Sequence, residues 1–206
     1  SGDFGRGHVT SSLLGSFNAK NLLAVLGVLL ALDVPFSKAL QALSHARTVP
    51  GRMECSGGGA QPLVVVDYAH TPDALEKAIT AARAHCRGQL WCVFGCGGER
   101  DRGKRPQMGA IAEKLADRVI ITDDNPRHED GDAIVADILA GIGDRRNVQT
   151  QRDRARAIAQ AIHAAAKGDV VLVAGKGHET YQVIGDRNLS YSDRDTVAAL
   201  LKGVCP

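Results

Sequence analysis

The sequence has few aromatic residues and almost no net charge, and both shortages exclude classes of partner. Aromatic side chains make up 4% of the 206 residues, and the formal net charge is +2. A nucleic-acid-binding protein needs a basic surface for the phosphates, and one that holds single strands also needs rings for base stacking. An anionic membrane surface likewise demands concentrated positive charge. We therefore predict no nucleic-acid partner and no membrane partner.

The sequence has an odd number of cysteines and no C-x-x-C pair, which argues against a zinc site or a disulfide framework. Reduced, buried thiols are the better interpretation. The apolar stretch 22–32 is too short to span a bilayer, and no leader with a basic start and small-residue end opens the chain. We predict a cytoplasmic protein. The five cysteines are Cys55, Cys86, Cys92, Cys96 and Cys205.

The first 47 residues favour a helical pair. A polar entry leads to Ser16, a possible N-cap for an apolar helix over 18–33, and Ser37 can cap a second helix over 38–46. The first helix is apolar on most faces, so we expect it to be buried. Because this chain offers the pair nothing obvious to pack against, we interpret residues 1–47 as the tail of a preceding domain. The turn residues 48–51 are a candidate hinge.

Residues 48–206 alternate strands with helices and form a second predicted domain. This alternation indicates βαβ units, and hence an α/β fold with a mostly parallel sheet flanked by helices. The chain shows no internal repeat. The expected strands are 63–67, 90–95, 118–123, 148–151, 169–174 and 181–184, and the expected helices are 72–86, 106–116, 133–142, 153–166 and 193–202.

Polar residues cluster where four of these strands end. The clusters cover 67–70, 95–104, 123–127 and 175–179. Ligands of open α/β sheets bind beside the carboxyl ends of the strands. We therefore expect all four clusters to line one crevice.

The segment from Gly98 to Lys104 fits G-x-x-x-x-G-K, the pattern of a phosphate-binding loop. Such a loop continues with Ser or Thr, whose hydroxyl binds magnesium, but here the next residue is Arg105. The four intervening residues are all charged. We interpret the match as accidental. Either Arg100 reaches into the crevice to hold an anion, or the segment is a solvated loop.

Two further loops carry groups that suit an amino acid. Arg127 can form a two-pronged contact with a carboxylate, and Asn125 can both donate and accept, although an Asx-turn with a surface arginine has the same sequence. Glu179 follows two glycines, which let the backbone approach a ligand closely. Its carboxylate suits an ammonium group, or else it is an exposed residue of a flexible loop. Asp67 could take a ribose hydroxyl or a magnesium-bound water, and His70 a phosphate or only a structural contact. Together these groups favour a zwitterion with an extra carboxylate.

Several segments in this order resemble the Mur ligases, in particular their diaminopimelate-adding member. They are DYAHTPDALEKA, FGCGGERDRGKRP, TDDNPR, AGKGHETYQ and YSDRD, and SFNAKNLLAVLGVLLAL is similar to the last helices of that family's central ATPase domain. The resemblance covers nearly the whole chain. DNPR is its most specific motif, because it marks diaminopimelate addition and lysine-adding relatives lack its arginine.

The resemblance implies a Rossmann-like, amino-acid-binding C-terminal domain preceded by a helical tail of the central ATPase domain. It also implies ATP-dependent ligation of meso-2,6-diaminopimelate to UDP-N-acetylmuramoyl-L-alanyl-D-glutamate, through an acyl phosphate. ATP and Mg²⁺ are the implied cofactors, and a monomer is expected. Carried over, the diaminopimelate set is Arg100, Asp124, Asn125, Pro126, Arg127, Gly175 and Glu179, and the ATP set is Asn18, Asn21, Arg52, Asp67 and His70.

The resemblance also implies what this chain should lack. The family's phosphate-binding loop, magnesium ligands, carbamylated lysine and UDP-binding domain are expected before Ser1, so we expect no catalytic residue and no metal ligand here, and an inactive fragment. Two alternatives stay open: another amide ligase of the superfamily, such as a folate polyglutamate ligase, or a non-catalytic α/β module that binds an acidic metabolite. A nucleotide hydrolase that uses Gly98 to Lys104 would bind magnesium nucleotide tightly by itself.

Overall fold

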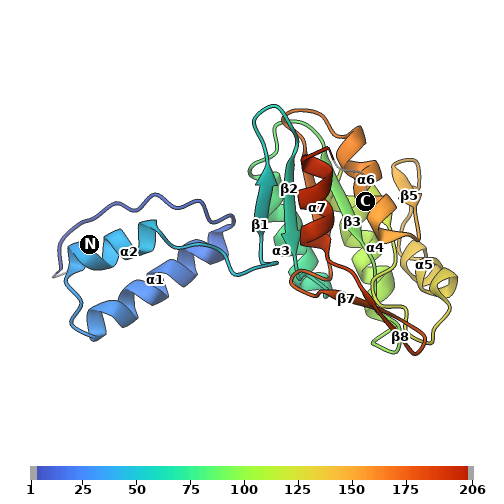
Figure 1. Cartoon of the computed structure of the whole chain (residues 1–206), viewed down its shortest axis with the longest axis horizontal. Coiled ribbons are helices and arrows are strands. Elements are labelled where there is room, and N and C mark those ends of the chain that lie inside the picture. Colours follow the sequence, from blue (N-terminus) through green and yellow to red (C-terminus); the bar gives the residue numbers. More distant parts are fainter. Residues whose placement is uncertain (1–3, 204–206) are drawn as a thin grey trace. The chain divides into compact units, whose positions relative to one another are not determined.

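The structure is a computed structural model that describes residues 4–203, and it divides into two compact units between Val49 and Pro50 (Figure 1). None of the helices in the described part of the chain is both long and apolar enough to cross a membrane.

The first unit is a helical pair, α1 (Ser16–Ala31) and α2 (Phe36–Ser44). Both helices begin earlier than predicted, so Ser16 and Ser37 are helical residues and not N-caps. The predicted burial of α1 is not found within the described residues: none of its residues is buried, and Leu23 and Val28 are 66% and 60% exposed. Within the first unit α1 packs against α2, and the two helices border an apolar hollow of about 500 Å³ together with the segment before α1.

The second unit contains a six-stranded sheet in the order β1-β2-β6-β3-β4-β5. Neighbouring strands from β2 to β5 are parallel, which confirms the predicted α/β class, while β1 is an antiparallel edge strand. The strands are β1 (Glu54–Gly57), β2 (Leu63–Asp67), β3 (Leu90–Phe94), β4 (Arg118–Ile121), β5 (Val148–Thr150) and β6 (Val170–Ala174).

Helices cover both faces of this sheet. Helices α6 and α7 lie on one face and contact each other, and α3, α4 and α5 form a row on the opposite face (Figure 1). Strands β2, β3 and β6 are apolar at nearly every position because they are buried on both faces. The helices are α3 (Pro72–Arg83), α4 (Lys104–Leu115), α5 (Gly131–Leu139), α6 (Arg154–Ala164) and α7 (Asp193–Leu201).

Two strands were not predicted from the sequence. β1 reads ECSG and β8 (Arg187–Ser190) reads RNLS, so neither carries the β-branched, alternating pattern that marks a half-buried strand. β8 pairs with β7 (Tyr181–Ile184) in an antiparallel hairpin outside the main sheet. This hairpin matters for the site, because it contacts the loop that follows β4.

Candidate functional site

A cavity of about 500 Å³ opens at the carboxyl ends of β2, β3, β4 and β6. All four polar clusters contribute to its wall, which confirms that they meet in one crevice. Six of the seven residues assigned to diaminopimelate by resemblance line it, Pro126 being the exception, and His70 from the nucleotide set also lines it. The lining residues are Tyr68, His70, Thr71, Gly95, Cys96, Gly97, Arg100, Asp101, Lys104, Asp124, Asn125, Arg127, Gly175, Glu179 and Tyr181.

The glycine loop after β3 and the DNPR loop after β4 are locked together. The Gly98 amide donates to the Asn125 carbonyl over 2.9 Å, and Arg127 Nη1 donates to the Gly98 carbonyl over 2.7 Å. A Cβ added at Gly98 would lie 1.9 Å from the Pro126 carbonyl oxygen. Only glycine therefore allows this approach. Pro126 shapes the pocket through its backbone.

The β7–β8 hairpin holds Arg127 in place. The Arg127 amide donates to the Val183 carbonyl over 3.0 Å, and the Gly185 amide donates to the Arg127 carbonyl over 2.8 Å. Arg127 adopts a φ of 53°, a left-handed conformation that is uncommon outside glycine. These contacts over-determine the strained residue and keep it half-buried in the cavity wall. The alternative of an arginine free on the surface is not what the structure shows.

Positive charge gathers on one side of the pocket. A Cβ added at Gly97 would lie 3.0 Å from Arg127 Nη1 and 3.6 Å from Arg100 Cγ, so the two arginines flank the same point. A Cβ added at Gly175, by contrast, would lie 2.7 Å from Asp124 Oδ2. The wall therefore has a cationic part at Gly97 and an anionic part at Gly175.

Lys176 is a site residue that the sequence reasoning missed. Its side chain is completely buried, and its ammonium donates to Asn125 Oδ1 over 3.0 Å and to Glu179 Oε2 over 2.8 Å. Asn125 Nδ2 also donates to Glu179 Oε2 over 3.0 Å. The three side chains form a closed polar triangle that orients both Asn125 and Glu179. The sequence carries no distinctive signal for it, because a lysine that follows a strand is usually a surface residue.

Burial shapes the protonation of two pocket groups. Burial raises the pKa of the Asp124 carboxyl, against the opposing charges of Arg154 and Lys176. Burial also raises the pKa of the Cys96 thiol to about 12. Because the thiolate and not the thiol is the nucleophile, Cys96 is unsuited to covalent catalysis at neutral pH.

The residues assigned to ATP are divided between the two units. Asn18 and Asn21 lie on α1, where Asn18 Nδ2 donates to the Leu14 carbonyl over 2.7 Å. Asp67 is buried, and its two oxygens accept the amides of Met53 and Ala69 over 2.8 Å each. These contacts give Asp67 a structural role whether or not it also binds a nucleotide.

Arg52 and His70 both lie beside one tyrosine. The Arg52 guanidinium sits 4.5 Å from the centre of the Tyr68 ring, and the His70 ring packs edge-on against the same ring at 4.6 Å. His70 Nδ1 is 2.8 Å from the Tyr68 carbonyl oxygen. The structure thus brings these two residues together at one border of the cavity. Their contact with a nucleotide stays a prediction.

The segment from Gly98 to Lys104 does not form a phosphate cradle. Arg105, which stands where a phosphate-binding loop has Ser or Thr, is fully buried and forms ion pairs with Glu129 and Asp137 at 2.9 Å each. Lys104 donates to the His70 carbonyl over 2.7 Å. Both cations are therefore engaged within the fold. Within residues 4–203, no cluster of three or more His, Cys, Asp or Glu side chains could hold a metal ion.

The chain belongs to the Mur ligase family. The model of the family's glutamate ligase domain matches residues 51–177. A solved UDP-N-acetylmuramoyl-L-alanyl-D-glutamate–2,6-diaminopimelate ligase is 40% identical to the chain, covers 98% of it and has a TM-score of 0.76. The chain spans 41% of the length of that ligase.

More distant solved structures share the fold. The UDP-N-acetylmuramate–alanine ligase of Thermotoga maritima is 20% identical, with 96% of this chain and 41% of the other covered and a TM-score of 0.68. The folylpolyglutamate synthase of the same organism is also 20% identical, with 82% and 38% covered and a TM-score of 0.63. At these identities the likeness concerns the fold alone.

Proposed function

We propose that the chain is the amino-acid-binding part of an ATP-dependent ligase that adds meso-2,6-diaminopimelate to UDP-N-acetylmuramoyl-L-alanyl-D-glutamate, a step of peptidoglycan precursor synthesis in the cytoplasm. The observation that carries this proposal is the divided charge of the cavity. Arg100 and Arg127 flank one point of its wall, and the carboxylates Asp124 and Glu179 also line it.

This arrangement suits an amino acid whose far end is itself a zwitterion. An arginine fork binds a carboxylate through paired, charge-assisted hydrogen bonds. Glu179, oriented by Lys176 through Oε2, is an acceptor for the remote ammonium. Lysine lacks the remote carboxylate and would leave Arg127 without its partner. The 40% identity to a diaminopimelate ligase supports the same substrate.

The chemistry proposed for the complete enzyme needs positioning and charge neutralisation, and no nucleophile from this chain. ATP supplies the phosphoryl group that activates the D-glutamyl carboxylate, and Mg²⁺ is proposed to bind upstream residues. The role of this chain's residues is to hold the incoming amine in position. By itself, the chain is proposed to bind the amino acid and not to catalyse ligation.

A calorimetric titration of the 206-residue chain tests this proposal. We expect meso-diaminopimelate to bind more tightly than lysine, by a factor of about ten or more, because an unpaired buried charge costs about 1–3 kcal/mol or more. Arg127→Ala should abolish this preference. Arg118→Ala is the matched control. Arg118 is the first residue of β4, so it lies at the opposite end of that strand from the cavity. Equal binding of both amino acids by the wild-type chain would refute the substrate.

We further propose that residues 1–47 are the C-terminal end of a central ATP-binding domain and that residues 48–206 are the C-terminal domain. The exposed apolar side chains of α1, such as Leu23, Val25 and Val28, support this, because such a surface normally packs against other protein. The coding sequence upstream of Ser1 decides the matter. It should continue in frame and contain G-x-x-x-x-G-K followed by Ser or Thr, and a start codon directly before Ser1 would contradict the proposal.

A further inference from the structure

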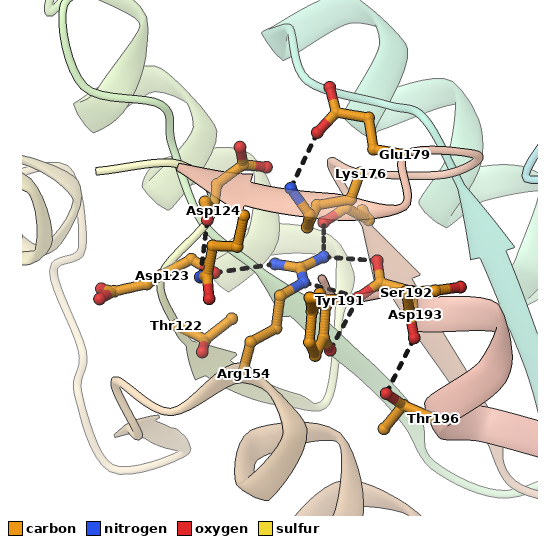
Figure 2. A network of polar contacts seen from close by, with 12 residues as sticks. Thr122, Asp123, Asp124, Arg154, Lys176, Glu179, Tyr191, Ser192, Asp193 and Thr196 are labelled. Atoms are coloured by element: carbon orange, nitrogen blue, oxygen red, sulfur yellow. Dashed lines mark hydrogen bonds and ion pairs between the residues drawn. The ribbon is translucent and has the colours of Figure 1, made fainter. Parts of the chain in front are cut away.

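Arg154 is a buried cation that the proposed chemistry does not use. It is the first residue of α6, is 2% exposed, and forms a two-pronged ion pair with Asp193, the first residue of α7. The Nε–Oδ1 distance is 2.7 Å and the Nη2–Oδ2 distance is 2.8 Å. Tyr191 adds a hydrogen bond from its hydroxyl to Asp193 Oδ1 over 3.1 Å (Figure 2).

The same guanidinium also reaches two backbone carbonyls at the pocket. Nη2 donates to the Ala174 carbonyl over 2.9 Å, and Nη1 contacts the Asp123 carbonyl over 3.3 Å (Figure 2). Ala174 ends β6 and directly precedes Gly175. Asp123 follows β4 and directly precedes Asp124. Both acceptors therefore belong to residues that come immediately before residues of the cavity wall.

These two strands are not neighbours in the sheet. Strand β3 lies between β6 and β4, so no ladder hydrogen bond joins them directly. Arg154 thus bridges the carboxyl ends of β4 and β6, which lie on either side of β3 where the cavity opens. The planar guanidinium of Arg154 donates hydrogen bonds to the Asp193 carboxylate and to both backbone carbonyls at once. A lysine ammonium in the same place could not make these contacts with the same geometry.

The bridge sets a close approach within the site. Gly175 adopts a φ of 119°, and a Cβ there would lie 2.7 Å from Asp124 Oδ2 and 3.8 Å from Arg154 Nη2. Arg154 therefore joins the start of the β4 loop, which carries Asp124 and Arg127, to the start of the β6 loop, which carries Glu179, and the Lys176–Asn125–Glu179 triangle joins the same loops further along. These two loops contain the groups that are proposed to hold the remote carboxylate and the remote ammonium of the ligand.

We propose that Arg154, held by Asp193, is a positioning residue that fixes the spacing of the β4 and β6 loops and thereby the chain length of the diamino dicarboxylic acid that the pocket accepts. This inference rests on the proposed function for the identity of the ligand. The bridging role itself rests on the geometry and can be measured without a ligand.

A double variant, Arg154→Met with Asp193→Asn, removes the bridge without leaving a buried charge unpaired. Replacing a buried ion pair by neutral side chains of similar size is often tolerated. The asparagine introduced at position 193 still offers an oxygen to the Tyr191 hydroxyl. Arg154→Lys is a second variant, which keeps the charge and loses the fork.

The control removes a partly exposed arginine that also contacts a carboxylate and a backbone carbonyl, at the opposite ends of the strands. Arg83 joins Asp117 over 2.8 Å and the Leu115 carbonyl over 3.0 Å, and Asp117 directly precedes β4. Arg83→Met with Asp117→Asn therefore removes one carboxylate contact and one carbonyl contact far from the cavity. Thermal unfolding of each variant verifies that it is folded.

The test is a nuclear magnetic resonance titration of the ¹⁵N-labelled chain with meso-2,6-diaminopimelate and with 2,7-diaminooctanedioate, which is one methylene longer. We expect the wild type and the control to prefer the shorter acid. In the bridge variants, affinity for the shorter acid should fall about tenfold and the preference should largely vanish, because small misplacements of binding groups are costly. The ligand-free amide resonances of Asp124 and Gly175 should shift in the bridge variants and not in the control.

The outcomes separate this inference from the proposed function. Bridge variants that keep the wild-type length preference, or the wild-type resonances of Asp124 and Gly175, would overturn the role of Arg154. If the wild-type chain binds neither acid, the proposed ligand is wrong, and the ligand-free resonances alone decide: a shift at both amides supports the bridge, and unchanged amides refute it.

Discussion

Replacing Lys176 by methionine should destabilise the second unit and do so through its polar partners. Methionine keeps the length and the apolar stem of lysine but removes the ammonium. Asn125 Oδ1 and Glu179 Oε2 would then lose a donor at 3.0 Å and 2.8 Å respectively, in a place where the lysine is 0% exposed. The carboxylate would be left with the Asn125 amide alone as its partner in this triangle.

The size of the effect follows from these contacts. Hydrogen bonds that involve a charge contribute about 1.5–3 kcal/mol each, and removing one partner of a buried ion pair costs about 3–5 kcal/mol. The Glu179 side chain is 17% exposed, so water can partly replace the lost partner. We therefore expect a loss of about 2–3 kcal/mol in the free energy of unfolding.

Urea unfolding followed by tryptophan fluorescence measures this loss. Trp91 is the one tryptophan of the sequence, lies in β3 and is 8% exposed, so it reports on the second unit. With a urea dependence of about 1–3 kcal/mol per molar, a loss of about 2–3 kcal/mol should lower the midpoint by about 0.7–3 M. Lys77→Met is the matched control, because Lys77 pairs with Asp73 on the surface of α3 and such pairs contribute under about 0.5 kcal/mol.

Two results would refute the reasoning. One is a Lys176→Met variant that loses no more stability than Lys77→Met. The other concerns the Glu179→Gln variant. In that variant Lys176→Met should cost less stability, because the carboxylate that Lys176 neutralises is gone. An unchanged cost in that background would show that Glu179 is not the energetic partner.

Three further predictions concern the same unit. Contact with Arg105 lowers the pKa of Glu129 to about 2, so the Glu129 carboxylate stabilises the fold fully above its ordinary pKa of 4.5 and loses this effect as the pH falls toward 2. Glu129→Gln should thus be less stable than wild type at pH 6. Thermal scans should show this difference in stability vanish between pH 4.5 and pH 2. Gly98→Ala should lower the melting temperature and the affinity for meso-diaminopimelate together, because the new Cβ would meet the Pro126 carbonyl at 1.9 Å. Burial raises the pKa of Asp124, so the buried carboxyl group costs stability at neutral pH. Asp124→Asn should therefore raise the melting temperature at pH 7 while weakening ligand binding. The gain in melting temperature should disappear below pH 3.8, where the carboxyl group is protonated in both the folded and the unfolded chain.

The sequence predicted the central strands and the crevice because their physical signals are local. A β-branched run such as that of β2 must be buried, and polar residues placed directly after parallel strands must meet at one edge of the sheet. The edge strand β1 and the hairpin strand β8 carry no such signal. Each pairs with its neighbour in sequence, β1 with β2 and β8 with β7, but its own side chains are exposed or only half-buried, so no apolar alternation marks it.

The site residues divide in the same way. Arg100, Arg127 and Glu179 could be named from the sequence because their charges suit a ligand. Lys176 and Arg154 could not, because a lysine after a strand or an arginine at a helix start is usually a surface residue. Their importance comes from tertiary contacts with groups 51 and 39 residues away, Asn125 and Asp193.

This division has a consequence for specificity in the family. The residues proposed to hold the amino acid lie on loops that two buried cations join through backbone carbonyls and neighbouring side chains, and we propose that these contacts set the spacing between them. Arg154 acts on the carbonyls before Asp124 and Gly175, and Lys176 acts on Asn125 and Glu179. A change of substrate by mutation of Arg127 alone should therefore remove the preference for meso-diaminopimelate without creating a good site for lysine, since the frame would still present Glu179 at the distance that suits the original ligand.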